Sequence, residues 1–420
     1  MQVSKTIPRS WKLARILACA ATLSCGLLSL AMMPAHAQSA ARHQSAKKVE
    51  LGTGAAVDAR GNFWIVTKEV EGADQYVVLQ GSSDGGRTWT APRRIQREPE
   101  AVSAEGENRP KLAFGPQGEM YITYTKPLAK PYTGEIRFIR SLDGGKTFTP
   151  PRTVHANRDL ITHRFESMIV DGSGRIYIAW IDKRDLEAAT ARKEKYAGAA
   201  VYYAVSEDGG NSFKGDYKLA DHSCECCRIA LALQPDGRPA ALWRHVFEPN
   251  VRDHAIAVLA PDGKASAPVR ATFDDWRIDA CPHHGPSLDY ADDGTRHQVW
   301  FNMRGEEGGV YYAAVSPAGS MGEAVRLGSA QAAHGDVAVD GKNIAVAWKQ
   351  FDGKGTAVLS RISSDGGLTW REQELARTAQ GSDQPRLLKT PGGITLAWRT
   401  QQDGMRIVPV MPARLEKAEK

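Results

Sequence analysis

Four short segments of this chain repeat one turn pattern, and an internal repeat constrains the fold more than any other feature. Each reads Ser-x-Asp-Gly-Gly-x-Thr/Ser before an aromatic residue: SSDGGRTW (82–89), SLDGGKTF (141–148), SEDGGNSF (206–213) and SSDGGLTW (363–370). An aspartate before two glycines suits a tight turn, because its carboxylate caps backbone N–H groups while glycine supplies positive φ. The pattern predicts recurring β units with structural turn aspartates at Asp84, Asp143, Asp208 and Asp365.

A second and more divergent repeat predicts the number of units. Short alternating strands flank a glycine-containing turn in seven places: 55–67, 112–125, 168–180, 231–243, 288–300, 337–348 and 387–398. The spacing of about 50 to 65 residues suits a four-stranded antiparallel sheet per unit. Weaker turns at 261–263 and 317–319 fall where two further copies of the first pattern are expected.

The Ser-x-Asp-Gly-Gly turn is similar to the Asp-box, and with it the chain resembles the sialidase-like, BNR-repeat family of β-propellers. The resemblance implies an all-β propeller, and the seven strand–turn–strand units predict seven blades. Six blades is the alternative, because hydrolytic sialidases of this family have six. We expect a strand near Val49 to complete the last blade and close the ring. A charged, helix-prone stretch at 182–198 reads as an excursion from the third blade.

The N-terminal 37 residues have the layout of a secretory signal peptide. Four basic residues precede an apolar run over 16–33, and Ala35-His36-Ala37 offers a cleavage site. An uncleaved anchor is the alternative, and no later stretch is long and apolar enough to span a membrane. We therefore expect a periplasmic or secreted protein with one propeller domain over 38–420. That domain has 50 basic and 48 acidic residues, a balance that does not favour a nucleic-acid partner.

In a propeller, the first strand of each blade lines the central channel, and ligands usually meet the channel mouth. Alignment on the turn glycine puts cationic or titratable residues of five successive blades at one level. We expect them to bind a ligand at the mouth: Arg109, Arg164, Arg228, His284 and His334. Thr53 and the stretch 384–386 fill the same level in the first and last blades. Such a ring suits a carboxylate or another anion. The alternative is that the arginines pair with strand carboxylates such as Glu166 and only hold blades together.

The family resemblance implies three arginines that hold a substrate carboxylate, but the chain departs from the family's catalytic pattern. The Phe/Tyr-Arg-Ile-Pro motif is absent, and no tyrosine follows Tyr311 and Tyr312 to serve as a late-blade nucleophile. No catalytic residue is assigned. The sequence therefore predicts a binding protein for an anionic glycan, small ligand, metal or protein partner, without sialidase activity. The alternative is an exo-sialidase-like glycoside hydrolase acting on an anionic sugar.

Four cysteines remain after the leader, and the propeller brings them to one sector. CECCR contains Cys224, Cys226 and Cys227 before the fourth inner strand, and DACPHHGP places Cys281, His283 and His284 before the fifth. Their even number and the oxidising compartment favour disulfides, one of them linking Cys226 or Cys227 to Cys281. A soft-metal site is the second interpretation, with copper(I) favoured over zinc because the ligands are rich in sulfur. A thiol redox centre is the third.

Overall fold

Each of the seven strand–turn–strand units begins a separate antiparallel sheet in the computed structural model, which describes residues 51–280 and 282–413. Blade one contains β1 (Gly54–Val57), β2 (Phe63–Glu71), β3 (Asp74–Ser82) and β4 (Arg93–Arg94). Blade two contains β5 (Lys111–Phe114), β6 (Met120–Pro127), β7 (Gly134–Ser141) and β8 (Arg152–Thr153). Blade three contains β9 (His163–Val170), β10 (Ile176–Asp182), β11 (Ala199–Ser206) and β12 (Lys214–Ser223).

The second half of the chain continues the same order of strands. Blade four contains β13 (Ala230–Leu233), β14 (Pro239–Arg244), β15 (His254–Val258) and β16 (Val269–Arg270). Blade five contains β17 (Ser287–Tyr290), β18 (Arg296–Asn302), β19 (Gly309–Val315) and β20 (Val325–Leu327), with the 3₁₀ turn η1 (Gly305–Glu307). Blade six contains β21 (Ala332–Asp340), β22 (Asn343–Phe351), β23 (Thr356–Ser363) and β24 (Arg371–Thr378). Blade seven contains β25 (Arg386–Thr390), β26 (Gly393–Thr400) and β27 (Gly404–Pro412).

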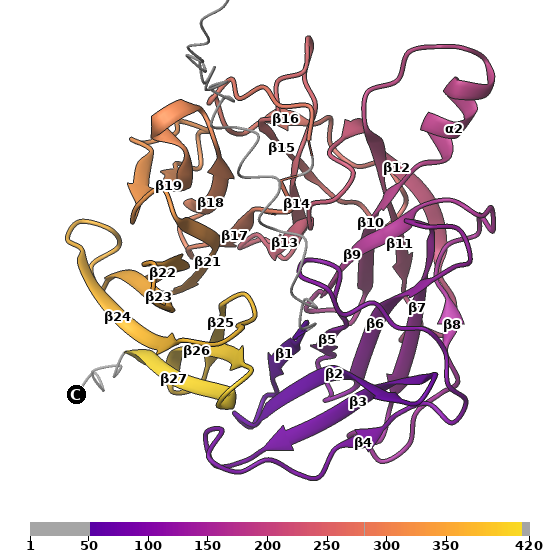
Figure 1. Ribbon diagram of the computed structural model, residues 1–420, viewed down its shortest axis with the longest axis horizontal. Coiled ribbons are helices and arrows are strands. Elements are labelled where there is room, and N and C mark those ends of the chain that lie inside the picture. The colour runs from indigo at the N-terminus through magenta and orange to yellow at the C-terminus, as the bar shows by residue number, and fades with distance from the viewer. Residues whose placement is uncertain (1–50, 281, 414–420) are drawn as a thin grey trace, which may run out of the picture. The chain divides into compact units, whose positions relative to one another are not determined.

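These sheets form a ring, and the first strand of every blade lies nearest its centre (Figure 1). The predicted seven-bladed all-β propeller is therefore confirmed. Only one α-helix occurs within the described ranges, α2 (Arg184–Ala191), which lies in the charged excursion of blade three. Acidic side chains in its first turn suit the positive end of the helix dipole.

Buried aromatic side chains fill the space between neighbouring sheets. Five tryptophans end the second strand of the repeated unit or lie near its end, and all five are fully buried: Trp180, Trp243, Trp300, Trp348 and Trp398. Truncating a buried tryptophan to alanine costs about 3–5 kcal/mol in proteins generally, so this recurring position carries much of the blade-to-blade packing.

Strand register assigns every connection to one of two ends of the ring. Gly54 pairs with Val66 and Val57 pairs with Phe63, so the first hairpin turns after Val57. Phe63 also pairs with Ser82, which places the Ser-x-Asp-Gly-Gly turns at this same hairpin end. The opposite end, where the inner strands begin, is called here the channel mouth. Helix α2 and the cysteine-rich segment both belong to the mouth.

The four repeated turns make one set of local hydrogen bonds. In the turn after β7, Ser141 Oγ donates to Asp143 Oδ1 at 2.7 Å and accepts from the Gly145 N–H at 2.8 Å. Thr147 donates to the same carboxylate through its backbone N–H at 2.9 Å and its hydroxyl at 2.7 Å. The corresponding hydroxyl and carboxylate contacts recur at Asp84, Asp208 and Asp365. Hydrogen bonds from Thr88 outweigh slight burial and lower the pKa of Asp84 to about 2.

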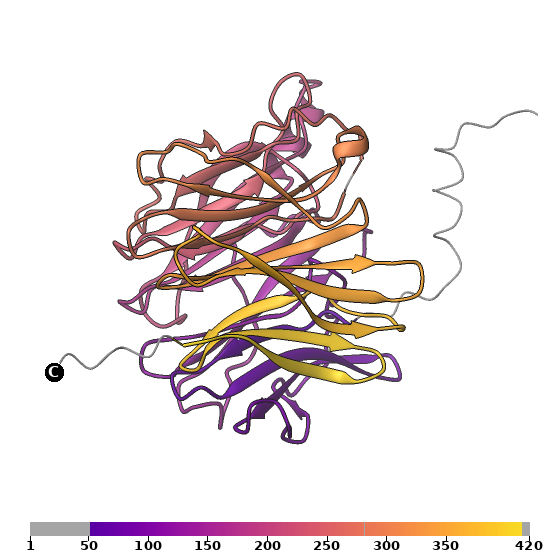
Figure 2. The same cartoon turned by 90° about the vertical axis from the view of Figure 1, so that its left-hand side faces the viewer.

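Blade one follows blade seven directly in the ring, as the indigo and yellow sheets show in Figure 2. The Thr53 N–H donates to Asp383 Oδ2 at 2.8 Å, which links the starts of the two inner strands. The seventh sheet has three strands within the described residues. The closing strand expected near Val49 lies outside those residues. No helix in the described ranges is both long and apolar enough to cross a membrane.

Candidate binding site at the channel

Glu107 is the buried acid around which the mouth is organised. Its oxygen Oε1 lies 3.3 Å from an Arg228 guanidinium nitrogen and 3.4 Å from His334 Nδ1. Burial alone raises the pKa of Glu107, but the Arg228 charge, a hydrogen bond from His334 and the Arg109 charge outweigh it and hold the pKa well below its usual range. Glu107 is therefore an ion-pair partner, and its carboxylate joins blade two to blades four and six.

Arg228 reaches across the channel at the mouth. Its guanidinium donates to the carbonyl oxygens of Pro286 and Gly335, both at 3.0 Å, as well as facing Glu107. A Cβ on Gly285 would lie 2.3 Å from the Arg228 side chain, so glycine allows this close approach. Residues of four blades thus converge on one guanidinium.

Arg109 closes the ring between the first and last blades. It forms a 2.9 Å ion pair with Asp383, donates to the Thr53 carbonyl at 3.2 Å and donates to Gln384. Both Arg109 and Asp383 are buried. Arg109 and Arg228 consequently tie blades together, as the structural alternative for the arginine ring anticipated.

The remaining predicted mouth residues have different surroundings. Arg164 pairs with the half-exposed Glu105 at 2.7 Å. The ring of His284 stacks between Phe301 and His334, with centroids 3.9 Å and 4.2 Å away. Burial first, and then the neighbouring His334, lowers the pKa of His284.

Inner strands of all seven blades line a cavity of about 450 Å³ that runs from Arg228 toward the hairpin end. Five basic side chains line it: Arg109, Lys111, Arg228, Arg386 and Lys389. Three acidic side chains accompany them: Glu107, Asp289 and Asp336. The wall is therefore cationic on balance. No tyrosine belongs to this lining among the residues that the structure describes.

Lys111 and Arg386 are two cavity bases that keep some exposed surface, and a third, Lys389, pairs with Asp289 at 3.1 Å and is 53% exposed. Lys111 Nζ lies 3.3 Å from Glu166, and Arg386 lies 3.4 Å from Asp336, yet their side chains remain 21% and 39% exposed. Burial outweighs the attraction of Glu166 and lowers the pKa of Lys111. The charge of Asp336 is the largest single influence on Arg386 and raises its pKa. Burial and the neighbouring arginines together outweigh that charge, so the pKa of Arg386 is lowered. Burial, and after it the neighbouring arginines, thus disfavours the charged forms of both bases.

Sequence reasoning missed this deeper level, although one signal was present. Lys111 stands two residues after Arg109 and Arg386 two residues after Gln384, and alternate residues of a strand share a face. The partners Asp336 and Asp383 carried no such signal, because they come from distant blades.

The cysteine-rich segment forms a buried turn between β12 and β13. Cys224 Sγ lies 3.6 Å from Cys227 Sγ and 3.9 Å from Cys226 Sγ. A disulfide bond is about 2.05 Å long, so neither contact is a disulfide. The predicted partner Cys281 lies outside the described residues. His283 is exposed on the adjoining segment.

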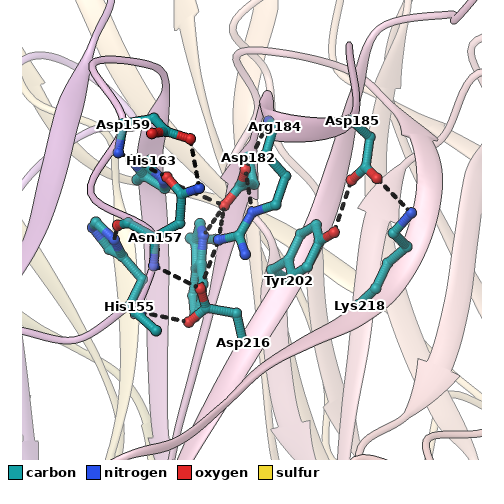
Figure 3. A network of polar contacts seen from close by, with 12 residues as sticks. His155, Asn157, Asp159, His163, Asp182, Arg184, Asp185, Tyr202, Asp216 and Lys218 are labelled. Atoms are coloured by element: carbon teal, nitrogen blue, oxygen red, sulfur yellow. Dashed lines mark hydrogen bonds and ion pairs between the residues drawn. The ribbon is translucent and has the colours of Figure 1, made fainter. Parts of the chain in front are cut away.

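A separate polar network holds the excursion of blade three at the mouth (Figure 3). Arg184, at the start of α2, donates to Asp182 at 2.7 Å and to Asp216 at 2.8 Å. The rings of His155 and His163 stack beside it with centroids 3.9 Å apart. Each of these acids has a partner, which makes the network an anchor for α2.

A second cavity of about 440 Å³ lies at the hairpin end between blades three and four. Its arginines are already paired locally, Arg175 with Asp171 and Arg238 with Asp236, both at 2.7–2.8 Å. It is remote from the residues at the mouth and offers no comparable cationic wall.

Comparisons with known proteins support the fold. No family model and no curated protein matches the chain. A solved polysaccharide lyase, an ulvan lyase bound to a glucuronate–rhamnose 3-sulfate unit, is 12% identical with a TM-score of 0.51 over 84% of this chain and 90% of that chain. A Dyadobacter fermentans protein of unknown function is 15% identical with a TM-score of 0.49, over 75% and 95%. The NanB sialidase of Streptococcus pneumoniae is 9% identical with a TM-score of 0.46, over 72% and 65%. At these identities the similarity concerns the fold alone, and that fold is the β-propeller that the repeats predicted.

Proposed function

We propose that this protein binds an anionic saccharide, a sugar bearing a carboxylate, inside the central cavity. The observation that carries the proposal is the cationic wall, in which Lys111 and Arg386 stay partly exposed to the cavity. A cleft lined by an excess of one charge concentrates ligands of the opposite charge. A cavity of about 450 Å³ is within the range that holds small organic ligands.

The deeper level suits a ligand better than the mouth does. Arg109 and Arg228 already direct their N–H groups to buried acids and carbonyls, so binding there would break existing contacts. A carboxylate between Lys111 and Arg386 would instead favour their charged forms, which burial, and after it the neighbouring arginines, disfavour. Hydrogen bonds between charged groups contribute about 1.5–3 kcal/mol each. The ulvan lyase with this fold was solved with a carboxylate-bearing sugar, which is consistent with such a ligand.

The other ligand suggested by the sequence, a soft metal with copper favoured, belongs to a separate place, the cysteine turn. The N-terminal basic and apolar segment supports the proposal that the chain acts in the periplasm or outside the cell.

Titration calorimetry with glucuronate, galacturonate and N-acetylneuraminate oligosaccharides tests the binding proposal, with neutral oligosaccharides as the comparison. Lys111→Met and Arg386→Met should each weaken binding about tenfold or more, since each removes a charged partner. Arg371→Met, on the exposed strand β24, is the matched control and should leave affinity unchanged. Equal affinity for neutral sugars, or unchanged affinity in both cavity variants, would contradict the proposal.

Cleavage of an anionic sugar is the second candidate, and Asp289 is the observation that favours it. Burial raises the pKa of this cavity carboxyl despite the opposing charge of Lys389. Glycoside hydrolysis uses an acid with a raised pKa beside a second carboxylate. Fluorogenic uronides should be cleaved by the wild type and not by Asp289→Asn if this candidate is right. We still expect no cleavage of a fluorogenic sialoside.

A further inference from the structure

The cysteine turn brings three sulfur atoms to one point at the mouth. Cys224, Cys226 and Cys227 are all buried, and their Sγ atoms lie within 4.8 Å of one another. The chain turns at Glu225–Cys226, and Glu225 points to the surface, where it pairs with Lys183. The turn therefore places the three cysteine sulfurs in the interior and the Glu225 carboxylate at the surface.

The sulfur separations match a metal site. Three sulfur atoms each about 2.3 Å from one ion lie about 3.8 Å apart in a tetrahedral arrangement and about 4.0 Å apart in a planar one. Here Cys224 Sγ lies 3.6 Å from Cys227 Sγ and 3.9 Å from Cys226 Sγ. The plainer alternative is that the thiols only pack against Trp243 and the other apolar residues of this core. Packing alone does not require three sulfurs to face one point.

A buried cation beside the turn is the independent observation. Arg244 is 1% exposed and forms no ion pair with a carboxylate among the residues described. Its guanidinium donates to the carbonyls of Arg252, His284 and Phe301, at 2.9, 3.1 and 2.7 Å, while its Nε has no hydrogen-bond partner.

Such a charge is costly unless an anion lies near. An uncompensated buried charge destabilises a protein by several kcal/mol. The backbone N–H of Cys224 donates to the Arg244 carbonyl at 2.9 Å, which ties the two segments together. Arg244 also lies over the Trp276 ring at 4.9 Å, and its charge acts on Asp274, with which it forms no ion pair. Thiolates in the turn would add negative charge on the side of Arg244 that faces the cysteines.

We propose that Cys224, Cys226 and Cys227 bind one copper(I) ion as a trithiolate, with Arg244 as the charge partner. Three thiols each lose a proton as three S–Cu bonds form, and the metal keeps its oxidation state. The complex carries two negative charges, of which Arg244 offsets one. An all-sulfur set of three ligands favours copper(I), because zinc sites of this kind take a fourth ligand. This site is separate from the anionic-ligand cavity and does not depend on it.

The test uses the full chain, reduced under anaerobic conditions, and copper(I) supplied as its bathocuproine disulfonate complex. The wild type should take up one equivalent, and copper X-ray absorption should show a shell of three sulfurs at about 2.3 Å. A shell dominated by nitrogen or oxygen would overturn the proposal, whatever the variants do. So would a disulfide between two of these cysteines in the native protein, without copper uptake on reduction.

Variants then assign the ligands and the charge partner. Cys224→Ser, Cys226→Ser and Cys227→Ser should each lower copper(I) affinity at least tenfold, while Met120→Leu, which removes a buried sulfur from blade two, should retain it. Arg244→Met should lower the affinity about tenfold and Arg244→Lys much less, with the thermal transition recorded for each to detect misfolding. Undiminished affinity in the three serine variants, or equal loss in Met120→Leu, would contradict a three-sulfur site.

Discussion

The four repeated turns at the hairpin end and the residues at the channel mouth both come from several blades, yet they are built differently. In the turns, the hydrogen bonds of the repeated motif join residues two to four positions apart, as between Ser141, Asp143 and Thr147. Arginines of the preceding blade add longer-range contacts to the turn carbonyls. At the mouth, contacts join Arg228 to Glu107 across 121 residues and Thr53 to Asp383 across 330. The first region repeats one hydrogen-bonding pattern in four blades. The second is a single network of contacts to which different blades contribute different side chains.

That difference explains why one region kept its sequence pattern and the other did not. A turn whose own side chains make the hydrogen bonds to its backbone N–H groups needs the same residues wherever it occurs. A residue at the mouth must fit partners from other blades, so Arg109, Arg228 and His334 differ although they stand at one level. The two regions should therefore respond differently to substitution and to pH.

Glu107→Gln should have the largest effect. The substitution keeps the shape but leaves Arg228 buried without its carboxylate, and breaking such a pair costs about 3–5 kcal/mol. Urea unfolding of the variant should show a loss of this size. A loss smaller than that of Ser141→Ala, a variant in one of the repeated turns, would contradict the contrast between the two regions.

Acid should weaken the mouth before it weakens the turns. Burial is the main cause that lowers the pKa of His334 to about 4 from 6.5, against the opposing attraction of Glu107, with Lys349 and Arg228 lowering it further. The unfolded chain therefore binds more protons than the folded one between these values, so stability is complete above pH 6.5 and falls toward pH 4. The contribution of His334 to the free energy of unfolding is about 3 kcal/mol. Asp84, with its pKa near 2, loses its contribution only below pH 3.8.

Melting temperatures measured from pH 7 to pH 3 check this order. His245 and His297, whose pKa values burial also lowers to about 4, add to the loss in the same window. His334→Asn isolates one share, because asparagine tolerates the φ of +52° at this position. The variant should flatten the dependence between pH 6.5 and pH 4 and leave the region below pH 3.8 unchanged. An unaltered slope would contradict the assignment.

Ser141→Ala should have a smaller effect confined to one turn. The buried hydroxyl bridges Asp143 and the Gly145 N–H, so its removal costs about 1–2 kcal/mol. Chemical unfolding should detect this loss while binding in the central cavity stays at the wild-type level. A change in ligand affinity would show that the hairpin end and the cavity are coupled.

Glu105→Gln should have the smallest effect among these variants. Its carboxylate pairs with Arg164, but the Glu105 side chain is 53% exposed, and exposed pairs contribute about 0.5 kcal/mol. Comparison with Glu107→Gln, two residues away, separates burial from charge as the cause. A loss as large as that of Glu107→Gln would mean that burial is not the deciding factor.

The fold could be predicted because its signals are local. The glycine turn and the alternating strands mark each blade, and the tryptophan near the end of the second strand marks its core. The level of Arg109, Arg228, His284 and His334 also followed from the alignment of blades. The partners Glu107, Asp336 and Asp383 did not, because only the closed ring decides which residues meet across the channel.

Arg244 illustrates the same limit at the cysteine turn. It is the last residue of β14, and in the sequence this position looks like any other strand end. Its burial depends on segments of blades four and five that contact it in the folded ring. The spacing of the cysteines indicated a candidate site in the sequence. No sequence pattern indicated that Arg244 would lie beside them.

A crystal structure of the protein with a uronic-acid oligosaccharide tests the central claim most directly. We predict the sugar carboxylate within hydrogen-bonding distance of both Lys111 Nζ and the Arg386 guanidinium, inside the cavity lined by the seven inner strands. An oligosaccharide bound on the outer surface of the blades, with the cavity unoccupied, would contradict it.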